Sequence, residues 1–169
     1  MIHRVTILFM TLAILGSAEA LTRYVSAHAN GYAPHHGVIG GYDGGHSYHA
    51  RAVVDGKWVP GKAGAYPNGL LVKAGIPYGG AEHRMQNYEI LTSTTTHRYQ
   101  KMKTGDRPPV NGIVGGYDGG QSYFAKGVIH GHTIPGKAGT DSHGNLVGAC
   151  FAWGGKEYRI NNFWVLLHN

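Results

Sequence analysis

The sequence contains a single cysteine, Cys150, so it cannot form an intrachain disulfide and its stability must come from a packed core. This thiol is either buried and inert or part of an intermolecular disulfide. Acidic residues are scarce as well, since nine Asp and Glu face 15 Lys and Arg and give a formal net charge of +6. The surplus favours anionic partners in general and does not bear on the fold. The sequence also lacks an Asn-X-Ser/Thr site for N-glycosylation.

Long apolar runs are missing too, apart from the start of the chain. His3 and Arg4 precede an apolar run over residues 5–15, and a stretch of small residues ends at Ala20. This order predicts a secretory signal peptide, residues 1–20, that is cleaved after Ala20. The run is shorter than the ~20 apolar residues that cross a bilayer, which argues against a membrane anchor. We therefore expect a secreted, extracellular protein without a membrane span.

The strongest pattern in the chain is an internal repeat. Residues 37–91 recur without a gap as residues 112–166, and 27 of the 55 positions are identical. Such a repeat indicates two copies of one structural unit. The predicted organisation is a signal peptide (1–20), an N-terminal segment (21–36), a first repeat (37–96), a linker (97–111) and a second repeat (112–169).

Glycine punctuates the repeats, and 28 glycines separate short runs of aromatic and β-branched residues. Such runs between turn residues favour an all-β fold of antiparallel strands, a sandwich or a barrel. One copy alone would bury little surface, so we expect the two to pack about a pseudo-twofold axis in a sandwich-like arrangement. The linker shows no evident core strand, and the N-terminal segment is either an extra edge strand or a mobile arm. The predicted strands cover residues 47–54, 70–74, 88–92, 112–117 and 122–129.

Four charged residues recur in both copies. They are Arg84 with Arg159, Asp43 with Asp118, Lys62 with Lys137, and Glu82 with Glu157. The last three pairs are the candidate site residues. Asp before Gly-Gly and Lys after Pro-Gly are ordinary turn chemistry, so each has a structural explanation. Alternatively, the carboxylate and the ammonium meet at one polar ligand, and the vicinal hydroxyls of a sugar can donate to the first and accept from the second. Spacing alone leaves both explanations open.

The ordered motifs GGYDGGxSYxA(R/K)xxxxGxxxPGKAG and YGGAEH…NYEIL resemble the DM-nine repeat family, and the match covers the chain from Gly37 onward. The resemblance implies an all-β fold of two pseudo-symmetric repeats. Some members are mannose-recognising lectins of innate immunity that form dimers and agglutinate microbes. Their binding residues are an Asp and a Lys in two of these motifs. The corresponding residues here are Asp43, Lys62, Asp118 and Lys137, and Glu82 and Glu157 match a third motif and would complete each site.

The second copy departs from this pattern near its end. Residues 163–166 read Phe-Trp-Val-Leu where the first copy has Tyr-Glu-Ile-Leu, and Tyr158 replaces His83. The two sites would differ if either position touches a ligand.

Other chemistry finds less support in the sequence. His130 and His132 lie two residues apart on one strand face, but the first copy does not share them, so we expect no metal and no cofactor. Asp43 and Glu82 could serve as the carboxylate pair of a glycan hydrolase, yet Lys62 is an unusual third partner for such a pair. Secretion argues against nucleic acid as a partner.

We therefore expect a non-enzymatic, lectin-like protein that binds mannose-type glycans or microbial surface polysaccharide and can form a homodimer. The alternatives are a structural or protein-interaction module and a glycan-acting hydrolase.

Overall fold

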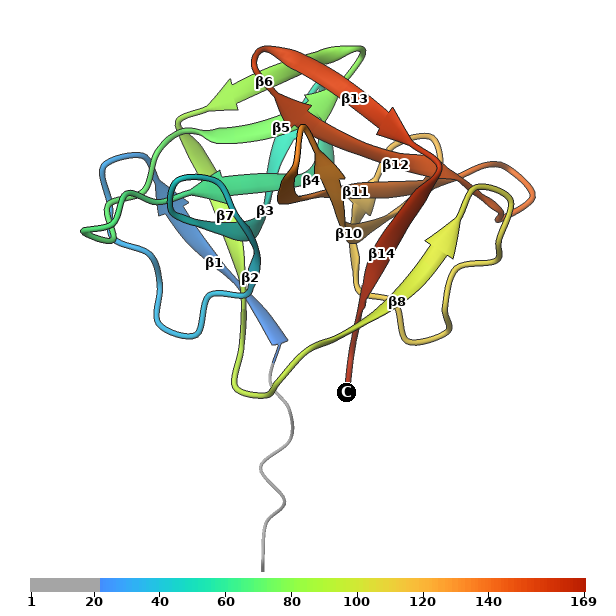
Figure 1. Cartoon of the computed structure of the whole chain (residues 1–169), viewed down its shortest axis with the longest axis horizontal. Helices are drawn as coiled ribbons and strands as arrows, with labels where there is room; N and C mark the ends of the chain where they lie inside the picture. Colours follow the sequence, from blue (N-terminus) through green and yellow to red (C-terminus); the bar gives the residue numbers. More distant parts are fainter. Residues whose placement is uncertain (1–21) are drawn as a thin grey trace, which may run out of the picture.

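The computed structural model describes residues 22–169, so the predicted signal peptide lies outside the described residues. These residues form 14 β-strands, and none of them lies in a helix (Figure 1). It follows that none of residues 22–169 lies in a helix that could cross a membrane. All strand pairs are antiparallel, which confirms the predicted all-β class.

Strand β1 (Thr22–His28) lies in the N-terminal segment, and the strands of the first repeat are β2 (Ile39–Tyr42), β3 (His46–Val54), β4 (Lys57–Gly64), β5 (Ala74–Tyr78), β6 (Ala81–Met85) and β7 (Asn87–Ser93). Strand β8 (Arg98–Lys103) lies in the linker, and the strands of the second repeat are β9 (Val114–Tyr117), β10 (Gln121–Ile129), β11 (His132–Thr140), β12 (Leu146–Trp153), β13 (Lys156–Ile160) and β14 (Asn162–Leu167). Strands β1 and β8 occupy equivalent positions before the two repeats.

The strand order is symmetric about its middle. It runs β1-β7-β3-β4-β5-β6-β13-β12-β11-β10-β14-β8, with β2 paired to β3 and β9 to β10 off this path. Exchanging each strand for its counterpart in the other repeat reverses this order. The predicted pseudo-twofold axis therefore passes where β6 meets β13, through the pair Ala81 and Lys156. The two repeats form one continuous sheet that curves around the core (Figure 1).

The expectation that residues 97–111 contain no core strand is wrong. Strand β8 lies there and pairs with β14, just as β1 pairs with β7 in the first repeat. Met102 of β8 is buried against the second core. The N-terminal segment likewise provides an edge strand, β1, at one end of the sheet. Strands β1 and β8 contain many polar residues, so the apolar pattern of the sequence was too weak to predict them. The pairing of β1 with β7 and of β8 with β14 determines their positions in the sheet.

Each repeat has its own apolar core, and a third cluster joins them. This shared cluster contains Val38 and Leu91 from the first repeat with Ile113, Phe124 and Leu166 from the second. Burial of these side chains contributes roughly 1.5–3 kcal/mol each to the stability of the fold, and the cluster contacts both repeats.

The repeats also cross over each other through β2 and β9. A Cβ atom on Gly41 of β2 would collide with the backbone oxygen of Thr133 in β11, and one on Gly116 of β9 would collide with that of Trp58 in β4. Only glycine permits this approach of two backbones. The first repeat therefore touches the part of the second that carries Lys137, and the second touches the part of the first that carries Lys62.

Candidate functional site

The predicted pair of the first repeat comes together at the start of the β2–β3 turn. Asp43 follows β2, and Gly44 takes a positive φ of 69°, which glycine adopts without strain. Lys62 lies in the middle of β4, where its Nζ is 3.5 Å from Oδ2 of Asp43. We call the surroundings of this pair the Asp43 site.

The second repeat reproduces the pair with a closer contact. Lys137 Nζ is 2.8 Å from Asp118 Oδ2 and 3.8 Å from Glu157 Oε1, and only 8% of the Lys137 side chain is exposed. We call this the Asp118 site. Each Asp thus lies beside its Lys, as the second of the two interpretations of the sequence requires, while their role in sugar binding stays a prediction.

The repeated glutamates lie where the two repeats meet. Glu82 Oε2 accepts a hydrogen bond of 2.8 Å from the backbone N–H of Gly155, and Glu157 Oε2 accepts one of 2.6 Å from that of Gly80. Each carboxylate therefore binds the β-hairpin turn of the other repeat. Glu82 also lines the Asp43 site. Its predicted role in ligand binding is therefore combined with a structural role, the hydrogen bond to Gly155.

Each site takes further side chains from the opposite repeat. His132 Nδ1 lies 3.9 Å from Asp43 Oδ1, and Lys62 Nζ lies 4.7 Å from the ring centroid of Trp153. At the other site, Lys57 Nζ lies 3.5 Å from Asp118 Oδ1. Tyr78 contributes its ring there, 5.4 Å from Nζ of Lys137.

Sequence reasoning missed these four residues. Lys57 and His132 occupy equivalent positions of the two repeats, as do Tyr78 and Trp153, but the residue types differ. A search for residues retained in both repeats discards such positions. The signal that could have found them is their chemistry, an imidazole in place of an ammonium and an indole in place of a phenol.

Two equivalent serines are buried near the Asp–Lys pairs in sequence. Ser47 and Ser122 are equivalent and each only 1% exposed, and neither hydroxyl has a hydrogen-bond partner among the described residues. Ser47 lines the Asp43 site. A buried hydroxyl without a partner is costly, so its presence in both repeats indicates a bond to a ligand or to water. The sequence shows a serine at this position in both copies. Only the structure shows that its hydroxyl is buried without a partner among the described residues.

The electrostatics of the Asp118 site favour the ionised pair. Burial raises the pKa of the Asp118 carboxyl, but the hydrogen bond and charge of Lys137, followed by those of Lys57, outweigh burial and bring the pKa below its usual value. Nearby, burial and then the negative charge of Glu157 raise the pKa of the Cys150 thiol to about 11. Cys150 is therefore a neutral, buried thiol at neutral pH, in keeping with an inert role.

A hollow of about 340 Å³ opens at the Asp43 site. Its walls combine the predicted Asp43, Lys62 and Glu82 with Ser47 and Tyr66. The hollow is large enough for a sugar ring, and it presents both hydrogen-bond donors and acceptors.

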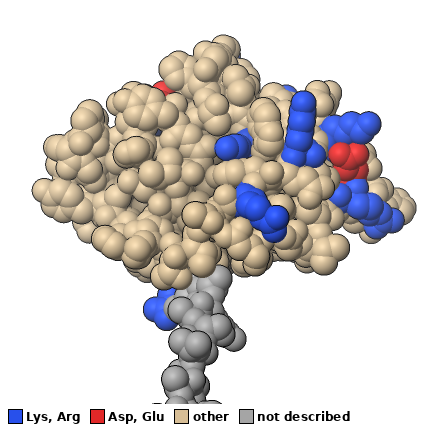
Figure 2. Space-filling model, turned by 60° about the horizontal axis from the view of Figure 1, so that its bottom comes forward, with Lys and Arg blue, Asp and Glu red and all other residues tan. Residues whose placement is uncertain are grey.

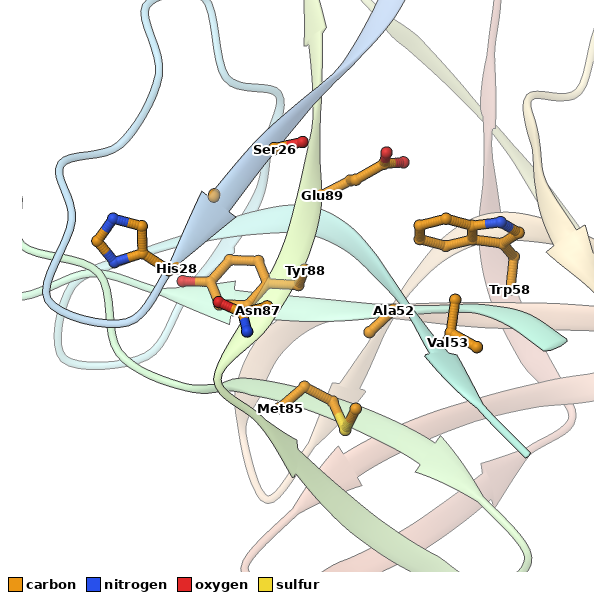
Figure 3. A pocket seen from close by; sticks show the side chains of 10 residues that line it. Ser26, His28, Ala52, Val53, Trp58, Met85, Asn87, Tyr88 and Glu89 are labelled. Carbon is orange, nitrogen blue, oxygen red and sulfur yellow. The ribbon is translucent and has the colours of Figure 1, made fainter. Parts of the chain in front are cut away.

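A second, larger cavity of about 590 Å³ lies on the outer side of β1, β3 and β7 (Figure 3). It opens because β3 and β7 pair only through Ala50 with Ile90 and Arg51 with Glu89. Figure 3 shows Trp58 and Val53 on one side, and His28 with Tyr88 on the other. None of the six predicted site residues lines this cavity.

Within residues 22–169, no group of three or more His, Cys, Asp or Glu side chains is placed to hold a metal ion. The His130 and His132 rings instead pack against Trp153, at centroid distances of 6.3 and 4.9 Å.

Comparison with known proteins agrees with the repeat pattern. The family model described as DM9 repeat matches residues 42–160. Among solved structures, the nematode sperm cell motility protein MFP2B is similar in fold, with a TM-score of 0.60 and 19% sequence identity over 87% of this chain. The chain spans about half of that protein, 46% of its length. None of the curated proteins matches this chain in sequence.

Proposed function

This chain belongs to the DM9 repeat family, whose repeats are non-catalytic binding modules, and we propose that it is a secreted lectin-like protein that binds mannose-type glycans. The observation that carries the proposal is the paired carboxylate and ammonium of both repeats, Asp43 with Lys62 and Asp118 with Lys137.

The chemistry of each pair suits a sugar. Two neighbouring hydroxyls can each donate to the carboxylate and accept from the ammonium, and these charge-assisted hydrogen bonds are stronger than neutral ones. Trp153 and Tyr78 lie beside the two lysines, and an aromatic ring can pack against the apolar face of a sugar. Both requirements for sugar recognition, paired polar groups and an aromatic surface, are met at each site.

Two sites on one body support binding to repetitive surfaces. Each site is small and partly exposed, so its affinity for a single sugar is modest. Simultaneous contact with a polysaccharide raises the apparent affinity by ~10²–10⁴ when both sites can reach it. A homodimer would double the number of sites. This arrangement fits the recognition and agglutination of microbes in innate immunity.

The experiment is a glycan array probed with residues 21–169, beside the double variant Asp43→Asn/Asp118→Asn. We expect mannose-rich glycans to bind the unaltered chain and the double variant to lose at least about tenfold in affinity. Asp106→Asn is the matched control, because the Asp106 carboxylate only caps the backbone N–H of Lys103.

Three outcomes would contradict the proposal. Binding of no glycan by the unaltered chain would refute a lectin and favour a structural or protein-interaction module. Full binding by the double variant would place the site elsewhere. Release of free sugar from a bound glycan would show a hydrolase.

A further inference from the structure

The Asp43 hollow is kept open by glycine. Gly64 and Gly75 both line it, and a Cβ atom on Gly75 would collide with Oε1 of Glu82. In the second repeat the equivalent of Gly75 is Cys150, a buried side chain that interacts with Glu157. The two sites therefore share their Asp–Lys pair, but they differ in the space around it.

Two buried polar groups face this hollow. Ser47 lines it with a hydroxyl that has no partner among residues 22–169. Glu82 has a side chain that is only 3% exposed, and its Oε1 has a weak contact with Arg84 Nη1 at 4.0 Å. Such incompletely paired groups are expensive unless a ligand or water binds them, so the hollow is built as a binding site.

The walls of the hollow carry more positive than negative charge. Its cations are Lys62, Lys73 and Arg84, and its anions are Asp43 and Glu82. The Asp43–Lys62 pair is internally balanced, and so is Glu82 with Arg84. Lys73 is exposed and forms none of the salt bridges found among the described residues. One ammonium in the wall is thus left for a charge on the ligand.

The second repeat removes this surplus. Gly148 stands at the position of Lys73, and Asp141 at that of Tyr66. Arg159 corresponds to Arg84, so that cation is kept. Lys57 lies at the Asp118 site where His132 lies at the Asp43 site, so it replaces the lost ammonium. At equivalent positions the Asp118 site therefore has as many lysine and arginine side chains as the Asp43 site and one carboxylate more, which leaves it without a surplus of positive charge.

We propose that the Asp43 site selects sugars that carry an anionic group, bound by Lys73, whereas the Asp118 site has no such preference. The inference rests on the proposed function of the same sites. Because Lys73 is exposed, its contribution is that of a surface ion pair. We expect a gain of about two- to fivefold in affinity for the anionic sugar.

The experiment isolates each site and compares ligands that differ only in the group at C6 of each sugar. Asp118→Asn leaves the Asp43 site intact, and Asp43→Asn leaves the Asp118 site. Calorimetry then measures β-1,4-linked mannotriose against the β-1,4-linked mannuronate trisaccharide, in which a carboxylate replaces each C6 hydroxymethyl group. Mannose and mannose 6-phosphate form a second pair, in which the anionic group is a phosphate ester. A gain for either anionic ligand at the Asp43 site alone, decreasing in about 0.5 M salt, supports the inference.

Variants identify the groups responsible. Lys73→Ala and Tyr66→Asp, each in the Asp118→Asn background, should bring the ratio of anionic to neutral affinity close to one. Lys101→Ala is the matched control, because Lys101 is an exposed lysine of β8 that does not line the hollow. Figure 2 shows that Lys and Arg side chains gather on one side of the molecule. Lys101→Ala should leave the ratio unchanged.

The failures of the two proposals can be told apart. If no trisaccharide or monosaccharide binds, the lectin function itself fails. If mannotriose binds through the two Asp residues but the ratio is one at both sites, only the present inference fails. If the ratio falls in Lys101→Ala and persists in both Lys73→Ala and Tyr66→Asp, anion binding is assigned to the basic residues of β8. This result would overturn the present inference as well.

Discussion

Lys57 of the first repeat places its Nζ 3.5 Å from Oδ1 of Asp118 in the second. The mirrored contact joins His132 of the second repeat to Asp43 of the first, with 3.9 Å between Nδ1 and Oδ1. The Asp carboxylate of each candidate site therefore has one cationic neighbour from its own repeat and one imidazole or ammonium from the other. The two candidate sites are not independent, because each repeat builds part of its neighbour's site.

Replacing Lys57 by Ala should raise the pKa of the Asp118 carboxyl toward its ordinary value. Burial alone would raise this pKa, and the lysines hold it down, Lys137 more strongly than Lys57. Lys137→Met should therefore give the larger rise. The measurement is a carboxyl-carbon NMR titration of Asp118. An unchanged titration midpoint in both variants would contradict the ion-pair geometry.

Replacing Ser47 by Ala should separate binding from folding. The hydroxyl has no partner among the described residues, so its loss should leave the free energy of unfolding unchanged or raise it by about 1 kcal/mol. Glycan affinity at the Asp43 site should fall about five- to tenfold, the equivalent of one hydrogen bond. Ser142→Ala, at an exposed turn, is the control for both measurements. Unchanged affinity for Ser47→Ala would mean that water alone fills this place.

Replacing Glu82 by Ala should weaken the junction of the repeats. The variant removes the acceptor for the Gly155 N–H, a bond to a charged group that contributes about 1.5–3 kcal/mol. Glu82→Gln keeps an acceptor oxygen and should lose less. Urea unfolding of both variants measures the difference. Equal stability of Glu82→Ala and the unaltered chain would assign Glu82 to ligand binding alone.

The sequence could predict the Asp–Lys pairs because both members lie in one repeat, the Asp at a turn and the Lys on the second strand after it. The register of β3 and β4, which pairs His49 with Lys62, is fixed by the short turn between them. Local sequence determines such geometry, so the repeat comparison was sufficient to find it.

The cross-repeat residues and β8 required the structure. Lys57 reaches the opposite site because β4 approaches β9, and His132 because β11 approaches β2. These close approaches depend on Gly116 and Gly41. Strand β8 forms because β14 pairs with it, and such non-local pairing leaves little trace in a six-residue polar segment. Its clearest signal is the recurrence of Arg23-Tyr24 as Arg98-Tyr99.

His49 makes the stability of the protein depend on pH. It is fully buried between the repeats, where its Nε2 lies 2.9 Å from the Tyr99 hydroxyl and its Nδ1 has no partner among the described residues. Burial, with smaller contributions from His97 and Lys126, lowers its pKa from 6.5 to about 3. Between these two values the unfolded chain binds a proton that the folded chain does not. His49 therefore lowers the free energy of unfolding as the pH falls from 6.5 toward 3, by up to about 1.4 kcal/mol per pH unit, and has no such effect above 6.5.

Replacing His49 by Phe should remove this pH dependence. Phe124 occupies the equivalent position of the second repeat and is fully buried, so a phenyl ring suits this environment. The Tyr99 hydroxyl keeps a second acceptor, the Ile39 carbonyl oxygen at 3.4 Å, and the cost of the unpaired Nδ1 disappears. We expect the two proteins to differ by no more than about 1 kcal/mol near pH 7.5 in urea unfolding. Near pH 5 the variant should be more stable by about 2 kcal/mol relative to that baseline. Equal losses on acidification would show that His49 is protonated in the folded protein, because only a group with the same pKa in both states contributes nothing to the difference.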